Sequence, residues 1–338
     1  MKISVVVPCR NESKYIAECI DAIFKCELPN NTELNVFIVD GMSDDGTRQI
    51  VLDLKKNYPF LHLIDNINQL TPFAFNLGIF AGGKVDYVQI VGARHILSNN
   101  YILNSIQKIE SDPSVWCVGG KIINEFINNT GQVISKAMST SFGMGLGNFR
   151  TLNKSGFTDT VTSPMYPYWV FDKIGFFDEE LIRNQDDDFN YRIKQAGGKI
   201  FFDNELSLKY YVRGSYKALS RQFFQYGYWK VFVNKKHKAV TTLRQLVPPF
   251  FVLYICLWLI SLFGGKLIFM ISSIPLIGYL FLNFFFSLKA RDQKVKWFAI
   301  FKTYLILHCF YGLGYLKGVL DFFLLNQKPS NKQKRLSR

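Results

Sequence analysis

The sequence predicts an α/β fold, in which a mostly parallel sheet carries helices on both faces, followed by helices that enter a membrane. Before Pro113, short apolar runs rich in β-branched residues alternate with stretches whose apolar residues recur at helical spacing. After residue 246, the chain contains apolar stretches long enough to cross the roughly 30 Å hydrocarbon core of a bilayer. These two patterns divide the chain into a catalytic or binding domain and a membrane region.

Four apolar runs are predicted to be strands: 3–8 (ISVVVP), 35–40 (NVFIVD), 61–65 (LHLID) and 86–91 (DYVQIV). Helical spacing follows the first run in residues 16–24 and the second in residues 50–54. Continuous apolar strands that are joined by helices form parallel sheets covered on both faces. In such sheets ligands bind beyond the carboxyl ends of the strands, so the residues after each run are the candidates for a site.

Each predicted strand is followed by polar residues. They are Arg10, Asn11 and Glu12 after the first strand, Asp40 and the segment GMSDDGT after the second, Asp65 and Asn66 after the third, and GARH (92–95) after the fourth. Loop polarity and helix capping explain any one of these loops. Four polar loops at one rim predict a binding site, in which the carboxylate of Asp40 is suited to accept a hydrogen bond from a nucleobase imide.

The membrane region is predicted to hold two spans, near 247–263 and 267–288, because neither stretch has a polar face. A third apolar stretch, 297–325, carries charged residues that are costly at the bilayer centre, so we expect it to lie at the interface. The aromatic residues of segment 223–229 are also expected at the membrane interface. The expected organisation is a soluble domain over 1–240, a membrane region over 241–328 and a basic tail over 329–338.

The formal net charge of +14 is concentrated beside the membrane segments, in residues 213–244, 289–296 and the tail NKQKRLSR. With two spans, all three basic segments lie on one side, which the positive-inside rule makes the cytoplasm. We therefore expect a multi-pass protein of the inner (cytoplasmic) membrane, with its first domain facing the cytoplasm and anionic lipids as electrostatic partners. Nucleic acid is not an expected partner, because the chain through Leu206 contains no basic run.

Four segments in order carry a resemblance to a known family: VVVPCRNESKYIAECIDAI, VDGMSDDGTRQIV, NLGIFAGG and RNQDDDFNYRIKQAGGKIFFD. The chain resembles a family 2 glycosyltransferase of the GT-A fold, of the membrane-bound succinoglycan-biosynthesis type. The resemblance continues through SFGMGLGNFR, RQFFQYGYWK and HCFYGLGYLKG. It implies an inverting enzyme that moves a sugar from a nucleoside diphosphate sugar to a lipid-linked saccharide, in capsule, exopolysaccharide or O-antigen assembly.

The resemblance also implies roles for single residues. Pro8, Arg10 and Glu12 line the nucleotide pocket, Asp40 holds the base and Asp45 fixes the loop after it. Beside these, Asn66, Arg94 and His95 are expected at the donor nucleotide because they lie in the polar loops of the same rim. Asp186 is the best match to the catalytic base, and Asp187 is the next. Trp169 and Arg192 are placed on the acceptor side, where Arg192 lines the site or anchors its helix, and SFGMGLGNFR is expected to be a mobile acceptor loop.

The chemistry of inverting transfer independently requires a carboxylate that takes the proton of the acceptor hydroxyl. Repulsion among three consecutive aspartates, Asp186 to Asp188, favours a raised pKa for one of them, as a base working near neutral pH needs. Acidic residues also stabilise the first turn of any helix through the macrodipole, so this run has a structural interpretation as well.

The segment GARH departs from the family, which has Asp-x-Asp or Asp-x-His there to hold a divalent cation on the diphosphate. Gly92, Ala93 and Arg94 occupy these positions. The leaving diphosphate needs compensation of its charge, either by a metal or by fixed cations. One hypothesis is a metal-independent enzyme in which Arg94 binds phosphate and His95 adds a donor.

Two other hypotheses stay open. In one, Mn²⁺ or Mg²⁺ is held by His95 alone or by unconventional ligands such as Asp45, Asp65 or the acidic run. In the other, the chain is a catalytically degenerate membrane subunit that serves as a scaffold in a polysaccharide assembly complex. The enzyme is favoured, because a scaffold has no physical need for three consecutive aspartates.

Overall fold

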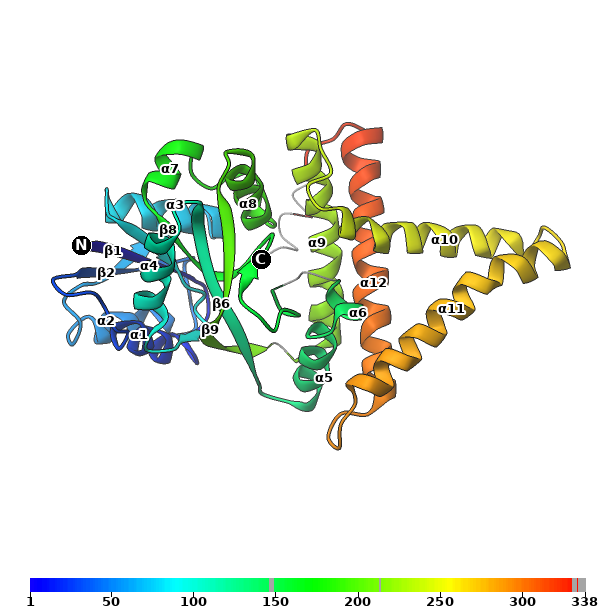
Figure 1. Ribbon diagram of the computed structural model, residues 1–338, viewed down its shortest axis with the longest axis horizontal. Coiled ribbons are helices and arrows are strands. Elements are labelled where there is room, and N and C mark those ends of the chain that lie inside the picture. The colour runs from blue at the N-terminus through cyan, green and yellow to red at the C-terminus, as the bar shows by residue number, and fades with distance from the viewer. Residues whose placement is uncertain (146–148, 213, 330–332, 334–338) are drawn as a thin grey trace. The chain divides into compact units, whose positions relative to one another are not determined.

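The computed structural model describes residues 1–145, 149–212, 214–329 and 333 (Figure 1). They form two compact units. The first unit consists of Met1–Glu125 with Gly147–Tyr211, and the second consists of Phe126–Leu146 with Val212–Ser337. Hydropathy places a division at residue 240, whereas packing places the helix Tyr216–His237 and the insertion after Glu125 with the C-terminal helices. The tail over 329–338 lies outside the described residues except for 329 and Gln333.

The strands form one sheet of nine strands, with the order β3-β2-β1-β4-β8-β6-β9-β5 and with β7 paired to β9. Their bounds are β1 Lys2–Cys9, β2 Glu33–Asp40, β3 Leu61–Asp65, β4 Tyr87–Ile90, β5 His95–Leu97, β6 Val115–Phe126, β7 Gly156–Phe157, β8 Thr162–Pro167 and β9 Lys199–Val212. The helices of the first unit are α1 Ile16–Phe24, α2 Thr47–Leu54, α3 Thr71–Gly82, α4 Tyr101–Ser111, α7 Trp169–Ile174 and α8 Gln185–Gln195.

The predicted parallel half of the sheet is confirmed: β1 pairs in parallel with β2 and β4, and β2 pairs in parallel with β3. The other half contains antiparallel pairs: β8 runs antiparallel to β4 and β6, and β9 runs antiparallel to β5 and β7. The sheet is therefore less parallel than the apolar runs alone indicate. Of the strands in these pairs, β6 to β9 begin at Val115 or later, beyond the segment where the strand and helix patterns alternate, whereas β5 lies within that segment.

Helices cover both faces of the sheet, as predicted (Figure 1). On β1, Val5 and Val7 belong to a core with α1, α2 and α4, whereas Val6 belongs to a core with α3, α7 and α8. Successive side chains of a strand point to opposite faces, so a run of consecutive valines serves both cores. This two-sided burial fixes the register, which places Cys9, Asp40 and Asp65 side by side at the carboxyl edge.

The second unit is helical. Its elements are α5 Asn129–Met138, α6 Ser141–Met144, α9 Tyr216–His237, the 3₁₀ turn Leu243–Leu246, α10 Val247–Ser261, α11 Lys266–Ala290, α12 Trp297–Val319 and the π turn Leu320–Leu324. Among the described residues, three stretches are long and apolar enough to cross a membrane: Leu243–Ser261, Lys266–Ala290 and Trp297–Leu324. Of the 18 most apolar consecutive residues in each stretch, 44% are buried in the third stretch, compared with 11% in the first and 6% in the second.

The third stretch is buried because α9 packs along α12. The contact is close at glycines: a Cβ on Gly314 would lie 2.0 Å from the carbonyl oxygen of Phe224, and a Cβ on Gly227 would lie 2.0 Å from that of Tyr311. Small residues allow helices to approach in this way. Of the aromatic residues expected at the membrane interface, Tyr228 and Trp229 are instead fully buried in this unit.

The segment SFGMGLGNFR, expected to be a mobile loop, begins with α6 in the second unit. The ring of Phe142 is surrounded by aromatic rings of α11 and α12, and its carbonyl oxygen lies 2.9 Å from His308 Nε2. Packing of this kind holds α6 against the apolar helices, so the prediction of a loop is wrong for Ser141–Met144. Gly147 of this segment lies outside the described residues.

Candidate active site

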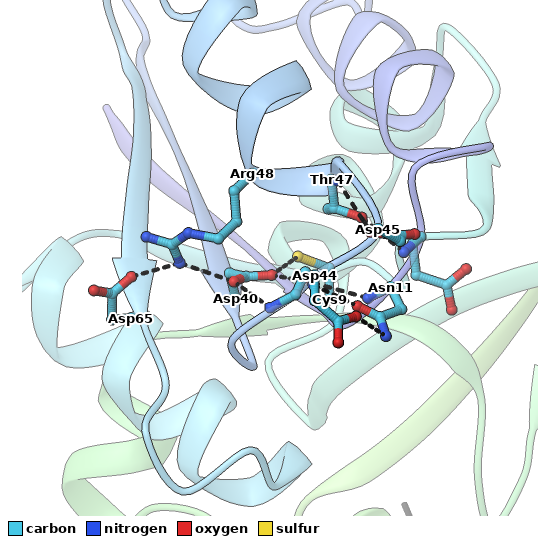
Figure 2. Close-up of polar contacts among 10 residues, drawn as sticks. Cys9, Asn11, Asp40, Asp44, Asp45, Thr47, Arg48 and Asp65 are labelled. Atoms are coloured by element: carbon cyan, nitrogen blue, oxygen red, sulfur yellow. Dashed lines mark hydrogen bonds and ion pairs between the residues drawn. The ribbon is translucent and has the colours of Figure 1, made fainter.

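The loops after β1 and β2 are joined by a hydrogen-bond network centred on Thr47, the first residue of α2 (Figure 2). The Thr47 hydroxyl lies 2.9 Å from the backbone nitrogen of Glu12, which donates to it, and 2.5 Å from Asp45 Oδ1. Asp45 Oδ2 accepts from the backbone nitrogen of Ser13, and Asn11 exchanges hydrogen bonds with Asp44. Asp45 therefore holds the two loops in place.

Asp45 is ionised over a wide pH range. Its limited burial favours the neutral form, but the hydrogen bonds from Thr47 and Ser13 outweigh that effect and lower the pKa of Asp45 to about 2. A carboxylate that accepts several donors is stabilised in its charged form. This agrees with a structural function for Asp45 in the loop, as the family resemblance implies.

Asp40 ends β2 and is fully buried. Its carboxylate accepts hydrogen bonds from the hydroxyl and backbone nitrogen of Ser43 and, at 2.8 Å, from Arg48 Nη1 (Figure 2). Burial favours the neutral form of Asp40, yet the bonds from Ser43 and Arg48 lower its pKa below the usual range. The predicted base-binding carboxylate is therefore ionised and lies beneath Arg48.

Arg48 is a residue that the sequence patterns did not single out. Its Nη1 lies 2.8 Å from Asp40 and 2.7 Å from Asp65, so it bridges the ends of β2 and β3 (Figure 2). Its side chain is one-third exposed, and that of Asp65 is about half exposed, so a ligand at this edge meets them before Asp40. Arg48 follows GMSDDGT directly, which is the only signal in the sequence for this position.

The remaining donor-site residues lie around the same edge. Asn66 is buried, receives no hydrogen bond at its Oδ1 from the described residues, and donates from its backbone to Asp40 O. Pro8 is aligned with Val39 near the end of β1. Arg10 is exposed and packs over Gly41, where a Cβ would lie 3.3 Å from two of its side-chain carbons.

The backbone is strained at this edge. Non-glycine residues with positive φ follow β1, β2 and β3, begin β8 and precede α8: Asn11 (56°), Met42 (59°), Gln69 (58°), Ser163 (41°) and Asn184 (59°). Such conformations are uncommon for residues with a Cβ, and they gather at functional sites. The strain is independent support for a site at the carboxyl edge.

Arg94 and His95 are both held by neighbouring side chains. Arg94 Nε donates to Glu12 Oε2 at 2.7 Å, and its guanidinium lies 4.7 Å from the ring centroid of Tyr15. His95 begins β5, and its Nδ1 lies 2.7 Å from Ser163 Oγ. Burial, together with the nearby charge of Arg150, lowers the pKa of His95 to about 4, so its ring is neutral at pH 7.

The positions of the family's metal ligands do not fit a metal ion in this chain. A Cβ on Gly92 would lie 3.0 Å from His95 Cε1 and 3.2 Å from both ring nitrogens, so the imidazole takes the space of a side chain at position 92. Arg94, at the second ligand position, is a cation paired with Glu12. Across the described residues, no three His, Cys, Asp or Glu side chains form a group that suits a metal ion.

The acidic run begins α8 and divides into different environments. Asp188 is buried and paired with Arg192, whereas Asp187 is half-buried and accepts from Asn184 Nδ2, and Asp186 is exposed. Arg192 also donates to the carbonyl oxygens of Ile174 and Phe176. Arg192 therefore anchors α8, which is one of the two functions expected for it.

Trp169 is not brought together with the other candidates. It begins α7, directly after β8, whose last residue Pro167 is aligned with the first residue of β4, Tyr87. Because β8 is antiparallel to β4, this is the amino edge of the parallel strands, opposite the loops described above. Trp169 packs edge-on against Trp116, at a centroid distance of 4.9 Å, and its predicted acceptor function does not agree with this position.

Comparison with known proteins decides the family. The model of the family described as "Glycosyl transferase family 2" matches residues 4–174, half of the chain. The chain belongs to this family. It is thus a glycosyltransferase, and the expected enzyme class and GT-A fold are confirmed.

Two curated relatives are similar over most of their length. One is the dolichyl N-acetyl-α-D-glucosaminyl phosphate 3-β-D-2,3-diacetamido-2,3-dideoxy-β-D-glucuronosyltransferase of Methanococcus voltae, 27% identical over 94% of this glycosyltransferase and 97% of the relative. The other is the succinoglycan biosynthesis protein ExoA of Rhizobium meliloti, 27% identical over 72% of this chain and 73% of its own.

A solved structure shares the fold. The mannosyltransferase PcManGT from Pyrobaculum calidifontis, in complex with GDP-Man and Mn²⁺, superimposes with a TM-score of 0.66 and 16% identity, over 94% of this chain and 86% of that one. At this identity the likeness concerns the fold alone.

Proposed function

We propose that this glycosyltransferase moves one sugar from a nucleoside diphosphate sugar to a hydroxyl of a lipid-linked saccharide, with inversion at the anomeric carbon, in surface polysaccharide assembly. The observation that carries the proposal is that one chain joins a family 2 catalytic unit to three apolar helices long enough to cross a membrane. A lipid-borne acceptor shares the surface to which such an enzyme is bound, which raises its effective concentration. The relative from M. voltae is named for a lipid-linked acceptor, which supports the proposal.

The donor nucleotide is assigned to the carboxyl edge, where the loops after β1, β2 and β3 are fixed by the Thr47 and Arg48 contacts. Prearranged loops bind a ligand without the entropic cost of ordering them. Arg48 and Asp65 present a donor and an acceptor at the surface, with the Asp40 carboxylate below. This arrangement is suited to a nucleobase edge that carries both a carbonyl oxygen and an N–H group.

Asp186 is the proposed general base. It is the exposed member of an acidic run in which Asp188 already serves an ion pair. The Asp186 carboxylate takes the proton of the acceptor hydroxyl while that oxygen forms a bond to the anomeric carbon. The bond between this carbon and the diphosphate oxygen breaks, and the nucleoside diphosphate leaves with the electron pair.

The proposed membrane arrangement has two spans, α10 and α11, and an interfacial α12. In the described part of the chain, α12 packs along its length against the polar helix α9, which carries Lys217, Arg221 and Lys235 among other basic residues. A helix pair with so many charges is costly at the bilayer centre and suited to the interface. With two spans, the catalytic unit and the loop 291–296 lie on the cytoplasmic side, next to anionic lipids.

The test of the reaction uses the full chain in detergent with mixed polyprenyl-linked saccharides and a panel of labelled UDP-, GDP- and dTDP-sugars. Transfer of label to the lipid fraction supports the proposal, and the anomeric configuration of the product, read by NMR, reports inversion. A product with the configuration of the donor contradicts the mechanism. Failure to bind any of these nucleotides contradicts the proposed function and favours the scaffold hypothesis.

A further inference from the structure

Two arginines lie near the position of the family's metal ligands. Arg94 is the third residue of the GARH segment, and the charge of Arg150 contributes to the lowered pKa of His95. The guanidinium of Arg150 is 6.0 Å from the ring centroid of Tyr210, and this ring packs edge-on against His95 at 5.3 Å. Arg94 precedes His95 directly in the chain and Arg150 lies near Tyr210, so both arginines adjoin the aromatic pair His95 and Tyr210.

Arg94 is held in one orientation. Its Nε donates to Glu12, which is buried, and its flat face lies on Tyr15, whose ring is 4.9 Å from that of Tyr211. The Tyr211 hydroxyl in turn donates to Glu18 at 2.9 Å. A guanidinium that is bound through Nε still presents its Nη groups, which form the fork that matches phosphate oxygens.

Glu12 makes contacts that the sequence patterns did not predict. The resemblance places it at the nucleotide, but its carboxylate is buried against Arg94 and its backbone nitrogen donates to Thr47. A buried carboxylate in such a pair repels an approaching phosphate less than a free one, and it fixes the cation that would attract the phosphate. Glu12 is thus a positioning residue for Arg94.

We propose that Arg94 and Arg150 form a fixed-cation site for the diphosphate of the donor, in place of a divalent metal, with Glu12 and Tyr15 positioning Arg94. Fixed donors need no reorganisation when charge develops on the leaving group, so they meet the demand that a metal meets in related enzymes. The His95 ring fills the space that a side chain at position 92 would need. This inference rests on the proposed function, because it takes a nucleoside diphosphate as the ligand.

The experiment is calorimetric binding of UDP, GDP and dTDP to the full chain in detergent, with EDTA and then with Mn²⁺. The nucleotide that binds is compared with its own nucleoside. We expect the same affinity in EDTA and in Mn²⁺, and an affinity for the diphosphate at least about tenfold lower in Arg94→Ala, the factor for one charge-assisted hydrogen bond. The affinity for the nucleoside stays unchanged.

Variants separate the contributions. Arg150→Ala also lowers the affinity for the diphosphate. Arg94→Lys keeps a positive charge beside Glu12, so it is the variant less prone to misfolding, and it loses less diphosphate affinity than Arg94→Ala. Glu12→Gln lowers diphosphate affinity in the wild-type chain but has no further effect in Arg94→Ala, since Glu12 acts through Arg94. Lys84→Ala, which removes an exposed cation just before β4, is the control and leaves binding unchanged.

Three results overturn the inference in different ways. Binding that disappears in EDTA and returns only with Mn²⁺ refutes the fixed-cation site but leaves the proposed sugar transfer standing. Equal losses of nucleoside and diphosphate affinity in Arg94→Ala show that Arg94 does not contact phosphate. Failure of every nucleotide to bind, with or without Mn²⁺, removes both the inference and the function on which it rests.

Discussion

Asp188 and Arg192 form a buried ion pair one turn apart in α8, with 2.8 Å between Arg192 Nη2 and Asp188 Oδ2. The same guanidinium donates to carbonyl oxygens at the end of α7 and just after it, so the pair ties the two helices together. Within a run of three identical residues, one aspartate is thus committed to the fold. Asp186 and Asp187 are less buried than Asp188, so substitutions at the three positions are expected to differ in their effect on stability.

Asp188→Asn is expected to lower the stability of the catalytic unit by about 3 kcal/mol, because it removes the buried partner of the partly buried Arg192 guanidinium. For a unit of this size, that corresponds to a fall in the thermal midpoint of roughly 6–12 °C. Scanning fluorimetry of the detergent-solubilised chain measures it. Asp187→Asn is the matched control and changes the midpoint much less; equal effects would show that the pair does not anchor α8.

Asp186→Asn is expected to reduce turnover by about 10²–10⁴-fold, the usual contribution of a general base, while donor binding and the thermal midpoint stay close to wild type. The Asp186 side chain is exposed and is not part of either hydrophobic core of the unit, so an amide in its place leaves the apolar packing unchanged. Single-turnover assays with calorimetry of the donor nucleotide distinguish chemistry from binding. Full activity in Asp186→Asn would identify Asp187 as the base instead. Full activity in both Asp186→Asn and Asp187→Asn would contradict the mechanism.

Arg48→Ala is expected to destabilise the catalytic unit by about 2 kcal/mol at pH 7, through loss of a charge-assisted bond to buried Asp40. Because the folded pKa of Asp40 is lowered, its ionised form stabilises the fold above the unfolded pKa, about 4, and this contribution is lost as the pH falls through the folded pKa. The difference between wild type and Arg48→Ala therefore narrows as the pH falls below about 4.

Urea unfolding at pH 7, 5, 4 and 3, followed by tryptophan fluorescence, measures this dependence on pH. Lys56→Ala, which breaks an exposed pair with Asp53 just after the same helix, is the control and has little effect at any pH. A difference between wild type and Arg48→Ala that stays constant down to pH 3 would mean that the bond to Asp40 does not cause it.

The sequence predicts the parallel half of the sheet well, because consecutive valines on β1 report burial on both faces and the register then aligns Cys9, Asp40 and Asp65. It predicts which loops form the site. It does not predict which polar side chains of the site bind one another. Glu12 contacts Arg94, and His95 contacts Ser163, only after segments that are distant in the sequence come together. The acceptor-side expectation for Trp169 does not agree with the edge at which α7 begins, because an aromatic residue in a motif carries no information on strand direction.

The packing of α9 on α12 is also not predicted by hydropathy. Glycines allow two helices to approach closely, but a glycine in the sequence does not indicate which helix will be its neighbour. Gly314→Ala is expected to destabilise the second unit by about 1–3 kcal/mol, because its new Cβ lies 2.0 Å from the carbonyl oxygen of Phe224 and the helices must separate. Gly278→Ala on α11 is the matched control: no atom lies within 4 Å of the added Cβ, and alanine favours the helix.

The two variants are compared by thermal unfolding in the same detergent and by protease sensitivity of the α9 segment. A lower midpoint with faster cleavage in Gly314→Ala, but not in Gly278→Ala, shows that α9 and α12 pack as described. The physical consequence concerns the membrane: a helix whose close partner carries many basic residues is held at the interface with it. If the two variants behave equally, α12 does not depend on α9 for its packing, and an arrangement in which α12 is a third span is favoured.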